Sequence, residues 1–338
     1  MSPLIFIFDG ILPDYCFYSL EFSKKYSNKK IILLITKNNK KIPKEIEHYF
    51  IEDFYKEDLS KKITLTNYHK EFWNGFWIKT IERFFILESF CKKYDINTFF
   101  HAELDNIVFN IESLDITLNQ FGKNFFFTKD RIERGLGGFV YINSLDILRN
   151  FCNFVLENLE KNFINDMYLL GKFSNTYSEQ CAILPNELNF FETDKISLKA
   201  IDSIKIGGIV DGIRIGDYLF GSDPRISKVM VFNKTEPKGD DNKTNFDYKN
   251  LLFYFSSSKK EFLITHKITK KSVKIYNLHV HSKLFKKLSN ERFFISILNK
   301  SNLNKRSLMT LNFKNILEGK LRGLKILFQK LVSEKNKN

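Results

Sequence analysis

The sequence predicts an α/β fold with a mainly parallel sheet, and three observations carry this prediction. Short apolar runs recur in the first third of the chain, at Leu4–Phe8, Ile31–Thr36 and Thr98–His101. These runs are continuous rather than alternating, which is typical of strands that are covered on both faces. Amphipathic segments of helical period separate them, as in a doubly wound α/β domain.

The rest of the chain continues this alternation. Phe76–Tyr94 is predicted to be an amphipathic helix, because six apolar residues recur there at helical spacing. The other expected elements are a helix that ends near Tyr26, strands at Ile63–Tyr68, Phe125–Thr128 and Gly137–Asn143, helices at Leu145 to about Leu159 and at Asn165–Phe173, an irregular segment at Asp211–Arg225, a polar loop at Glu236–Lys249, and short strands within 251–281.

Composition excludes several classes of protein. Of the 338 residues, 43% are hydrophobic, which is enough to bury a core and too much for a chain that is disordered over most of its length. The four cysteines lie far apart without CxxC spacing, so we expect reduced, buried thiols and no structural zinc. No apolar run approaches the roughly 18 residues that a membrane-spanning helix needs. We therefore expect a cytoplasmic protein, either soluble or peripheral on the inner face of the membrane.

The charge balance is strongly basic. Lys and Arg number 53 against 39 Asp and Glu, a formal net charge of +14. Such an excess favours polyanionic partners, namely nucleic acid, an anionic membrane surface or phosphorylated substrates. The alternative is compositional, because a chain rich in Lys, Asn, Ile and Phe is also what an AT-rich genome encodes. No helix-turn-helix, zinc-finger or RNA-recognition signature is found, so no specific nucleic acid is expected.

The C-terminal segment is expected to be separate from the main domain. We divide the chain into a domain at 1–290 and a helical extension at 291–338. Leu311–Val332 is predicted to be a basic amphipathic helix. It could lie on an anionic membrane surface, which would suit a lipid-linked acceptor, or pack on the domain with a solvated basic face.

Two carboxylates follow the expected strand at Thr98–His101. Glu103 and Asp105 lie two residues apart at its carboxyl end, where ligands of open α/β sheets bind. Both can converge on one divalent cation, and their hard oxygens suit Mg²⁺ or Mn²⁺. Such a cation would bridge a diphosphate and neutralise its charge as it leaves. Most such triplets are solvated surface, and the position after an apolar strand is what favours a metal here.

A second polar group lies in the segment NLHVHSK. If this segment is a strand, His279 and His281 share a face. One imidazole could complete the metal shell, and Lys283 could hold a phosphate. Alternatively, both are ordinary strand histidines.

Arg83 and Asp166 have more than one interpretation. Arg83 lies on a largely apolar helix face, and a buried Arg must be paired. Its partner could be a carboxylate of the metal site, a ligand phosphate or a core Glu. Asp166 is at the start of an expected helix, where a carboxylate is commonly a cap, and it gains chemical interest only if that helix points at the metal.

Six segments follow one another in an order that resembles nucleotide-sugar-dependent glycosyltransferases of the GT-A fold, of the type found in bacterial surface-glycan clusters and some large DNA viruses. They are FWIKTIERFFILESF, FFHAELDN, GGFVYIN, NDMYLL, DGIRIGDYLFGSDPR and NLHVHSK. The resemblance covers roughly Pro3 to Lys287. It implies a GT-A-like, Rossmann-related fold, with a mixed, mainly parallel sheet flanked by helices, to which the basic C-terminal helix would be added.

The resemblance also implies a metal and phosphate site. Glu103 and Asp105 match the D-x-D position that coordinates the metal and the donor diphosphate, with Glu in place of the first Asp. The HVHSK segment is similar to the C-terminal metal-binding His and phosphate-binding Lys of these enzymes. His281 is preferred to His279 for the metal because it is closer to Lys283.

Further positions match the donor-binding parts of these enzymes. Gly137, Gly138 and Asn143 match the strand that lines the donor sugar. Arg83 matches a helix Arg near the donor. Asp9, in the loop after the first strand, falls where the nucleoside is usually held.

The implied activity is metal-dependent transfer of a sugar from a nucleoside-diphosphate sugar to a hydroxyl of a glycan or lipid-linked acceptor, with Mn²⁺ or Mg²⁺ as cofactor. Asp166 matches the acidic residue that faces the acceptor or the anomeric carbon. It is the candidate base if the reaction inverts, and a positioning residue if it retains. Two alternatives remain: a nucleic-acid-binding protein, and a non-catalytic glycan-binding scaffold whose site has decayed, as Glu at position 103 would allow.

Overall fold

The computed structural model describes residues 2–43, 45–55, 76–159, 165–187, 200–212, 214–220 and 250–281, together with Phe285 and Ile295. Several expected features lie outside the described residues: the strand at Ile63–Tyr68, the loop at Glu236–Lys249, Lys283, the division at residue 290 and the helix at Leu311–Val332. These remain predictions.

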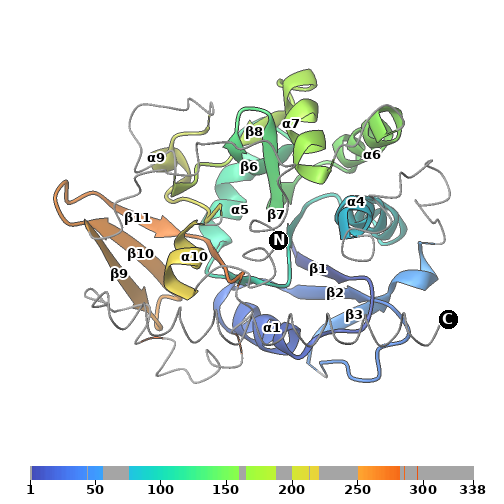
Figure 1. Cartoon of the computed structure of the whole chain (residues 1–338), viewed down its shortest axis with the longest axis horizontal. Helices are drawn as coiled ribbons and strands as arrows, with labels where there is room; N and C mark the ends of the chain where they lie inside the picture. Colours follow the sequence, from blue (N-terminus) through green and yellow to red (C-terminus); the bar gives the residue numbers. More distant parts are fainter. Residues whose placement is uncertain are drawn as a thin grey trace, which may run out of the picture.

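A mixed sheet of seven strands forms the centre of the molecule (Figure 1), in the order β3-β2-β1-β4-β7-β6-β8. The first four strands are parallel, β7 is antiparallel to both neighbours, and β8 is parallel to β6. The strand bounds are β1 (Leu4–Phe8), β2 (Ile31–Ile35), β3 (Glu47–Phe50), β4 (Phe99–Ala102), β6 (Phe125–Arg131), β7 (Arg134–Ile142) and β8 (Cys181–Ile183). The prediction of a mixed, mainly parallel α/β sheet is confirmed.

Helices cover both faces of this sheet. One face is covered by α4 (Phe76–Lys93), α6 (Leu145–Leu159) and α7 (Asp166–Thr176), and the other by α1 (Asp14–Tyr26) and α5 (Glu112–Asn119). The alternation of side chains along β1 separates the two cores. Ile5 packs in the cluster that contains Phe84 of α4, whereas Leu4 and Phe6 pack in the cluster that contains Leu20 of α1. Strands covered in this way read as continuous apolar runs.

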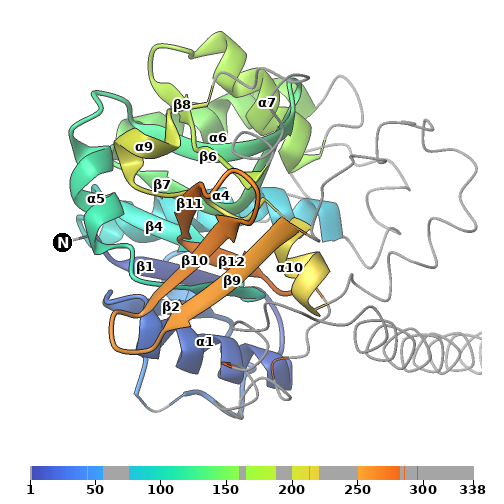
Figure 2. The same ribbon diagram turned by 90° about the vertical axis from the view of Figure 1, so that its left-hand side faces the viewer.

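A smaller antiparallel sheet lies beside the central one (Figure 2). It consists of β9 (Leu251–Ser256), β10 (Glu261–His266) and β11 (Ser272–Ile275). A third apolar cluster joins this sheet to α1 and α10 (Arg214–Phe220), through Phe22, Phe253, Phe262 and Ile215. A separate two-stranded ladder pairs β5 (Asn106–Val108) with β12 (Asn277–His279). The short helices η1 (Ile51–Asp53) and α9 (Ser203–Ile206) complete the described elements.

One expected element is corrected by the structure. The segment Asp211–Arg225 was expected to be irregular because glycines punctuate it, but residues 214–220 form the helix α10. Gly216 is required there for a reason of packing: a Cβ at this position would lie 1.9 Å from the carbonyl oxygen of His279. The helix therefore rests directly on the backbone of β12.

Two statements on composition can be compared with the structure. All four cysteines are free and buried, as expected. Within the described part of the chain, no helix has the length and apolar character needed to cross a bilayer.

Candidate metal centre

The turn between β4 and β5 carries Glu103 and Asp105 at the carboxyl edge of the central sheet. The N–H of Glu103 donates to the carbonyl of Gly138 on β7 (3.0 Å), and the N–H of Asn106 donates to the carbonyl of Glu103 (2.9 Å). On the other side, the N–H of Val280 donates to the carbonyl of Asp105 (2.7 Å). The turn is therefore fixed between β7 and the end of β12, two segments that are far apart in sequence.

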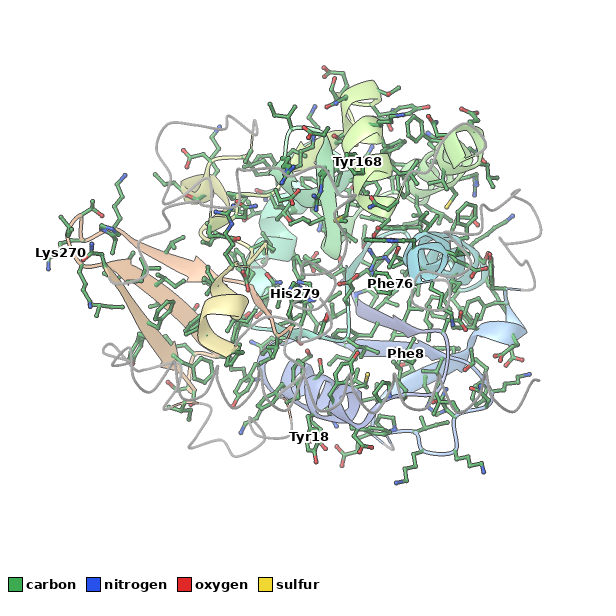
Figure 3. The ribbon with its side chains drawn as sticks, in the orientation of Figure 1. Phe8, Tyr18, Phe76, Tyr168, Lys270 and His279 are labelled. Carbon is green, nitrogen blue, oxygen red and sulfur yellow. The ribbon has the colours of Figure 1, made fainter. Side chains whose placement is uncertain are left out.

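The antiparallel pairing of β5 with β12 brings an imidazole to the two carboxylates. His279 pairs with Asn106, the residue after Asp105. Its Nε2 lies 3.1 Å from Oδ1 of Asp105 and 3.6 Å from Oε2 of Glu103. Figure 3 shows His279 in the middle of the molecule beside α10. Three side chains from two distant segments thus meet at one point.

This group has the composition and the spacing of a cation site. Glu103, Asp105 and His279 each offer a ligand atom, and these atoms lie within 4.8 Å of one another. A six-coordinate Mg²⁺ has ligands at 2.0–2.1 Å, which places adjacent ligands about 3 Å apart. Gly138 lines the same space, because a Cβ there would lie 3.2 Å from Oε2 of Glu103 and 3.3 Å from Cε1 of His279. Two carboxylates and one imidazole fit a hard to borderline divalent cation such as Mg²⁺ or Mn²⁺.

Arg83 on α4 lies behind this group and joins it to α7. Its Nη1 donates to Oε1 of Glu103, and its Nη2 donates to Oδ2 of Asp166 at 2.8 Å. The guanidinium passes against the backbone of β7, since a Cβ on Gly137 would lie 2.3 Å from Nη2. The Arg83 and Asp166 side chains are only 8% and 6% exposed, so this is a buried ion pair.

Burial and charge act in opposite directions on these acids. Burial tends to raise the pKa of Glu103, but the Arg83 guanidinium opposes it and the net pKa is lowered. Burial raises the pKa of Asp166, which Arg83 offsets only in part. Counted as ionised groups, Glu103, Asp105 and Asp166 carry three negative charges against one positive charge on Arg83. Among the described residues, the acidic groups at this site therefore outnumber the one guanidinium that faces them.

A polar network holds the backbone of His279 in place. Oδ2 of Asp211 accepts from the N–H groups of His279 and Gly216, both at 2.9 Å, and Oδ1 accepts from that of Ile215 at 3.1 Å. The same carboxylate therefore caps α10 and fixes β12. Burial, together with Glu187, raises the pKa of Asp211 to about 8.

Two asparagines extend this network to the turn that carries the acids. Asn277 on β12 donates from Nδ2 to Oδ1 of Asn106 (2.6 Å) and accepts the N–H of Asp211 (3.0 Å). Asn106 in turn donates to the carbonyl of Gly138 (3.1 Å). The sequence analysis assigned no defined role to Asp211, Asn106 or Asn277. Asn106 and Asn277 lie in the two candidate metal-binding motifs, which was the available signal, whereas Asp211 lies far from both motifs in the sequence.

The structure distinguishes the two candidate histidines. The imidazole of His279 lies against both carboxylates, whereas the ring of His281 packs against that of His279, with centroids 4.0 Å apart. The sequence-based preference for His281 is thus replaced by His279 as the residue within reach of both acids. Lys283, on which that preference rested, lies outside the described residues.

Asp9 and Asn143 occupy opposite edges of the sheet. Asp9 follows β1 at the carboxyl edge, where Lys79 of α4 pairs with its carboxylate at 3.1 Å. Asn143 is separated from the site, which corrects the expectation that it lines the donor sugar. Ala102 at the end of β4 pairs with Phe139, but Ile142 pairs with Phe99 at the start of β4. At about 3.3 Å per residue, Asn143 is about 16 Å along the strand from Gly138.

Comparisons with known proteins find distant likenesses. No protein-family model matches the sequence, and no curated protein matches it at a significant level. Similar solved structures include mouse xyloside xylosyltransferase 1 in its apo form, with 8% identity, a TM-score of 0.38 and coverage of 55% of this chain and 86% of that chain. Another is the galactosyltransferase LgtC in complex with donor and acceptor sugar analogues, with 14% identity, a TM-score of 0.37 and coverage of 60% and 81%.

A cytidylyltransferase from Leptospira borgpetersenii is also similar, with 16% identity, a TM-score of 0.34 and coverage of 69% of this chain and 89% of that chain. At such scores a likeness does not assign a function. The functional proposal therefore rests on the chemistry of the candidate metal centre.

Proposed function

We propose that this chain is a metal-dependent glycosyltransferase that moves a sugar from a nucleoside-diphosphate sugar to a hydroxyl of a glycan or lipid-linked acceptor. The observation that carries the proposal is the meeting of Glu103, Asp105 and His279 at the carboxyl edge of parallel strands. Ligands of open α/β sheets bind at this edge. The order of sequence motifs that resembles GT-A glycosyltransferases supplies the class of donor.

The residues present define what each would do. Glu103, Asp105 and His279 would hold Mn²⁺ or Mg²⁺, and the bound cation would neutralise charge on the departing diphosphate. Gly138 keeps the space beside these ligands clear of a side chain. Asp9, half-buried at the same edge, is proposed to contact the nucleoside.

Asp166 is better suited to positioning than to proton transfer. One of its oxygens is bound to Arg83, and its side chain is almost completely buried. A general base must reach the acceptor hydroxyl at hydrogen-bond distance. The geometry therefore favours a mechanism in which Asp166 does not take a proton, as a retaining transfer permits.

Other parts of the proposal concern residues outside those described. Lys283 is proposed to bind a donor phosphate, and the basic segment Leu311–Val332 to contact an anionic membrane surface from the cytoplasmic side. Lys283→Ala should raise the KM for the donor with little change in metal binding, because a phosphate contact is lost while the metal ligands remain.

The test is a thermal-shift panel of nucleoside diphosphates, each with and without Mn²⁺. A ligand at 100 times its Kd stabilises the folded state by about 2.7 kcal/mol. We expect one diphosphate to raise the Tm, and only when Mn²⁺ is present. Glu103→Gln and Asp105→Asn should abolish this shift, whereas Asp146→Asn, an exposed carboxylate on α6, should keep it.

Two results would overturn the proposal. The first is that no nucleoside diphosphate raises the Tm at any Mn²⁺ concentration. The second is that the Glu103 and Asp105 variants show the same rise in Tm as the unmodified protein. Tight, steeply salt-dependent binding of DNA or RNA without any nucleotide response would favour the nucleic-acid alternative. Binding of metal and nucleotide without turnover of any nucleotide sugar would favour the non-catalytic scaffold.

A further inference from the structure

Arg83 contacts the candidate metal centre from inside the protein. Each of its terminal nitrogens has a carboxylate partner, Glu103 for Nη1 and Asp166 for Nη2. The guanidinium is pressed against the backbone at Gly137 and is almost fully buried. This environment offers little surface for a bound sugar nucleotide. Arg83 therefore acts on the two acids that it joins, Glu103 and Asp166.

The contact with Glu103 has a specific geometric consequence. Arg83 occupies Oε1, and the other oxygen, Oε2, is the one that faces Nε2 of His279 at 3.6 Å and the Gly138 backbone. A free carboxylate can rotate and bind a cation through either oxygen or through both. A carboxylate held by an arginine presents one defined oxygen, which lowers the cost of ordering it when the cation binds.

Asp166 fixes the other end of the arginine. It is at the first turn of α7, and that helix packs closely on the β6–β7 hairpin, since a Cβ on Gly171 would lie 1.9 Å from the carbonyl oxygen of Glu133. The position of Asp166 is thus set by a rigid helix. The chain of contacts runs from α7 through Asp166 and Arg83 to Glu103.

We infer that Arg83 and Asp166 are positioning residues of the cation site: Arg83 holds Glu103 with Oε2 toward the cation, and Asp166 acts through Arg83. This inference rests on the proposed function, because it presumes that Glu103, Asp105 and His279 bind a divalent cation. It gives Asp166 a role in metal affinity in place of a role in proton transfer.

Charge and geometry predict opposite effects when Arg83 is changed. A cation next to the metal repels it, so loss of the positive charge alone would tighten Mn²⁺ binding. Loss of positioning would weaken it. Arg83→Lys keeps the charge but loses the planar two-pronged donor set, so it isolates the geometric contribution.

The experiment is a titration of the full chain with Mn²⁺ alone, followed by electron paramagnetic resonance of the free ion. We expect Arg83→Lys to raise the Kd for Mn²⁺ about 10-fold to 100-fold, the range for residues that orient metal ligands, and Asp166→Asn, one contact further from the metal, to raise it by less. Arg149→Lys is the matched control. Arg149 also bridges two carboxylates, Glu88 and Asp146, but on the surface, and its variant should leave the Kd unchanged.

Circular dichroism melts of each variant separate folding from binding. If Arg83→Lys does not fold, Asp166→Asn is measured together with Asp166→Glu, which keeps the negative charge and changes only the position of the carboxylate that holds Arg83. Mn²⁺ affinity equal to that of the unmodified protein in both folded variants would overturn the inference. So would a fall in kcat of Asp166→Asn with unchanged Mn²⁺ affinity, which is the result expected of a proton acceptor.

The two proposals fail in different ways. If the unmodified protein binds Mn²⁺ but Arg83→Lys and Asp166→Asn bind it equally well, the inference fails and the proposed function stands. If the unmodified protein binds neither Mn²⁺ nor any nucleoside diphosphate, the proposed function fails first.

Discussion

The two edges of the central sheet both bury charged side chains, but they balance them differently. At the amino edge, Lys29 pairs with Asp115, which also accepts from the N–H of Ser2 (3.1 Å) and from its hydroxyl (2.6 Å). One positive charge meets one negative charge. At the carboxyl edge, Arg83 faces Glu103, Asp105 and Asp166, and the acids are in excess.

This difference separates a structural ion pair from the proposed binding site. A buried pair that is balanced and hydrogen-bonded needs nothing further, and its removal is felt as a loss of stability. A buried group with an excess of acids destabilises the fold until a cation binds to it. Removal of one of its acids should therefore weaken cation binding more than it lowers the free energy of unfolding. The comparison can be tested by changing each edge in turn.

The largest effect is expected at the amino edge. Lys29→Met would leave the Asp115 carboxylate buried without its ammonium partner, at a cost of about 3–5 kcal/mol in the free energy of unfolding. Urea denaturation measures this cost, and the Kd for Mn²⁺ of the folded fraction should be unchanged. A decrease in the free energy of unfolding of less than about 1 kcal/mol would mean that the Lys29–Asp115 pair does not stabilise the fold as a buried ion pair does.

A second change tests whether the carboxyl edge depends on packing as well as charge. Gly216→Ala would place a methyl group on the carbonyl oxygen of His279 and force α10 away from β12. We expect a loss of about 1–3 kcal/mol in the free energy of unfolding, the usual range for overpacking, and weaker Mn²⁺ binding because His279 is displaced. Gly122→Asp is a useful comparison, since nothing lies within 4 Å of a Cβ there and Asp tolerates its left-handed backbone better than most residues.

Acid should act on the amino edge in a defined direction. Burial tends to raise the pKa of Asp115, but Lys29 and Ser2 outweigh it and lower the pKa in the folded state. A lowered pKa means that Asp115 stabilises the fold above its unfolded pKa of about 3.9, and that this contribution is lost as the pH falls through the folded value. The stability difference between the unmodified protein and Asp115→Asn should therefore shrink below about pH 4. A difference that stays constant from pH 7 to pH 3 in urea melts would contradict this.

The smallest effect is expected on the surface. Arg149→Lys breaks two exposed contacts, to Glu88 and Asp146, and should change the free energy of unfolding by about 0.5 kcal/mol or less. Measured beside Arg83→Lys, it shows how much of the effect of a bridging arginine comes from burial. Equal decreases in the free energy of unfolding in the two variants would contradict the expectation that a buried bridging arginine stabilises the fold more than an exposed one.

The elements that sequence analysis located well are those with a strong local signal. β1, β2 and α4 begin and end within about one residue of the expected positions. Buried strands and amphipathic helices have hydrophobic patterns that are visible within a short stretch of consecutive residues. β3 and β5 carry no such signal. β3 contains Glu47 and His48 at the edge of the sheet, and the three residues of β5 form a strand only because β12 pairs with them.

The site shows the same division between local and distant information. Glu103 and Asp105 were found because they follow an apolar strand directly. The choice between His279 and His281 depends on the register of β12 against β5, which no local pattern contains. The error at Asn143 has a related cause: it and Gly138 belong to one predicted strand, but the strand is long enough to place them at opposite edges of the sheet.

The imidazole of the candidate cation site comes from a residue far along the chain. During synthesis, the two acids are therefore made well before His279. The contact between Asn277 and Asn106 joins residues 171 positions apart, and His279 lies just beyond Asn277. At about 5–20 residues per second, a ribosome adds that stretch in roughly 10–30 s. During this interval the nascent chain carries both acids and no third ligand. The proposed cation site therefore requires synthesis through β12, and a product cut short before β12 would keep the two acids but lack His279.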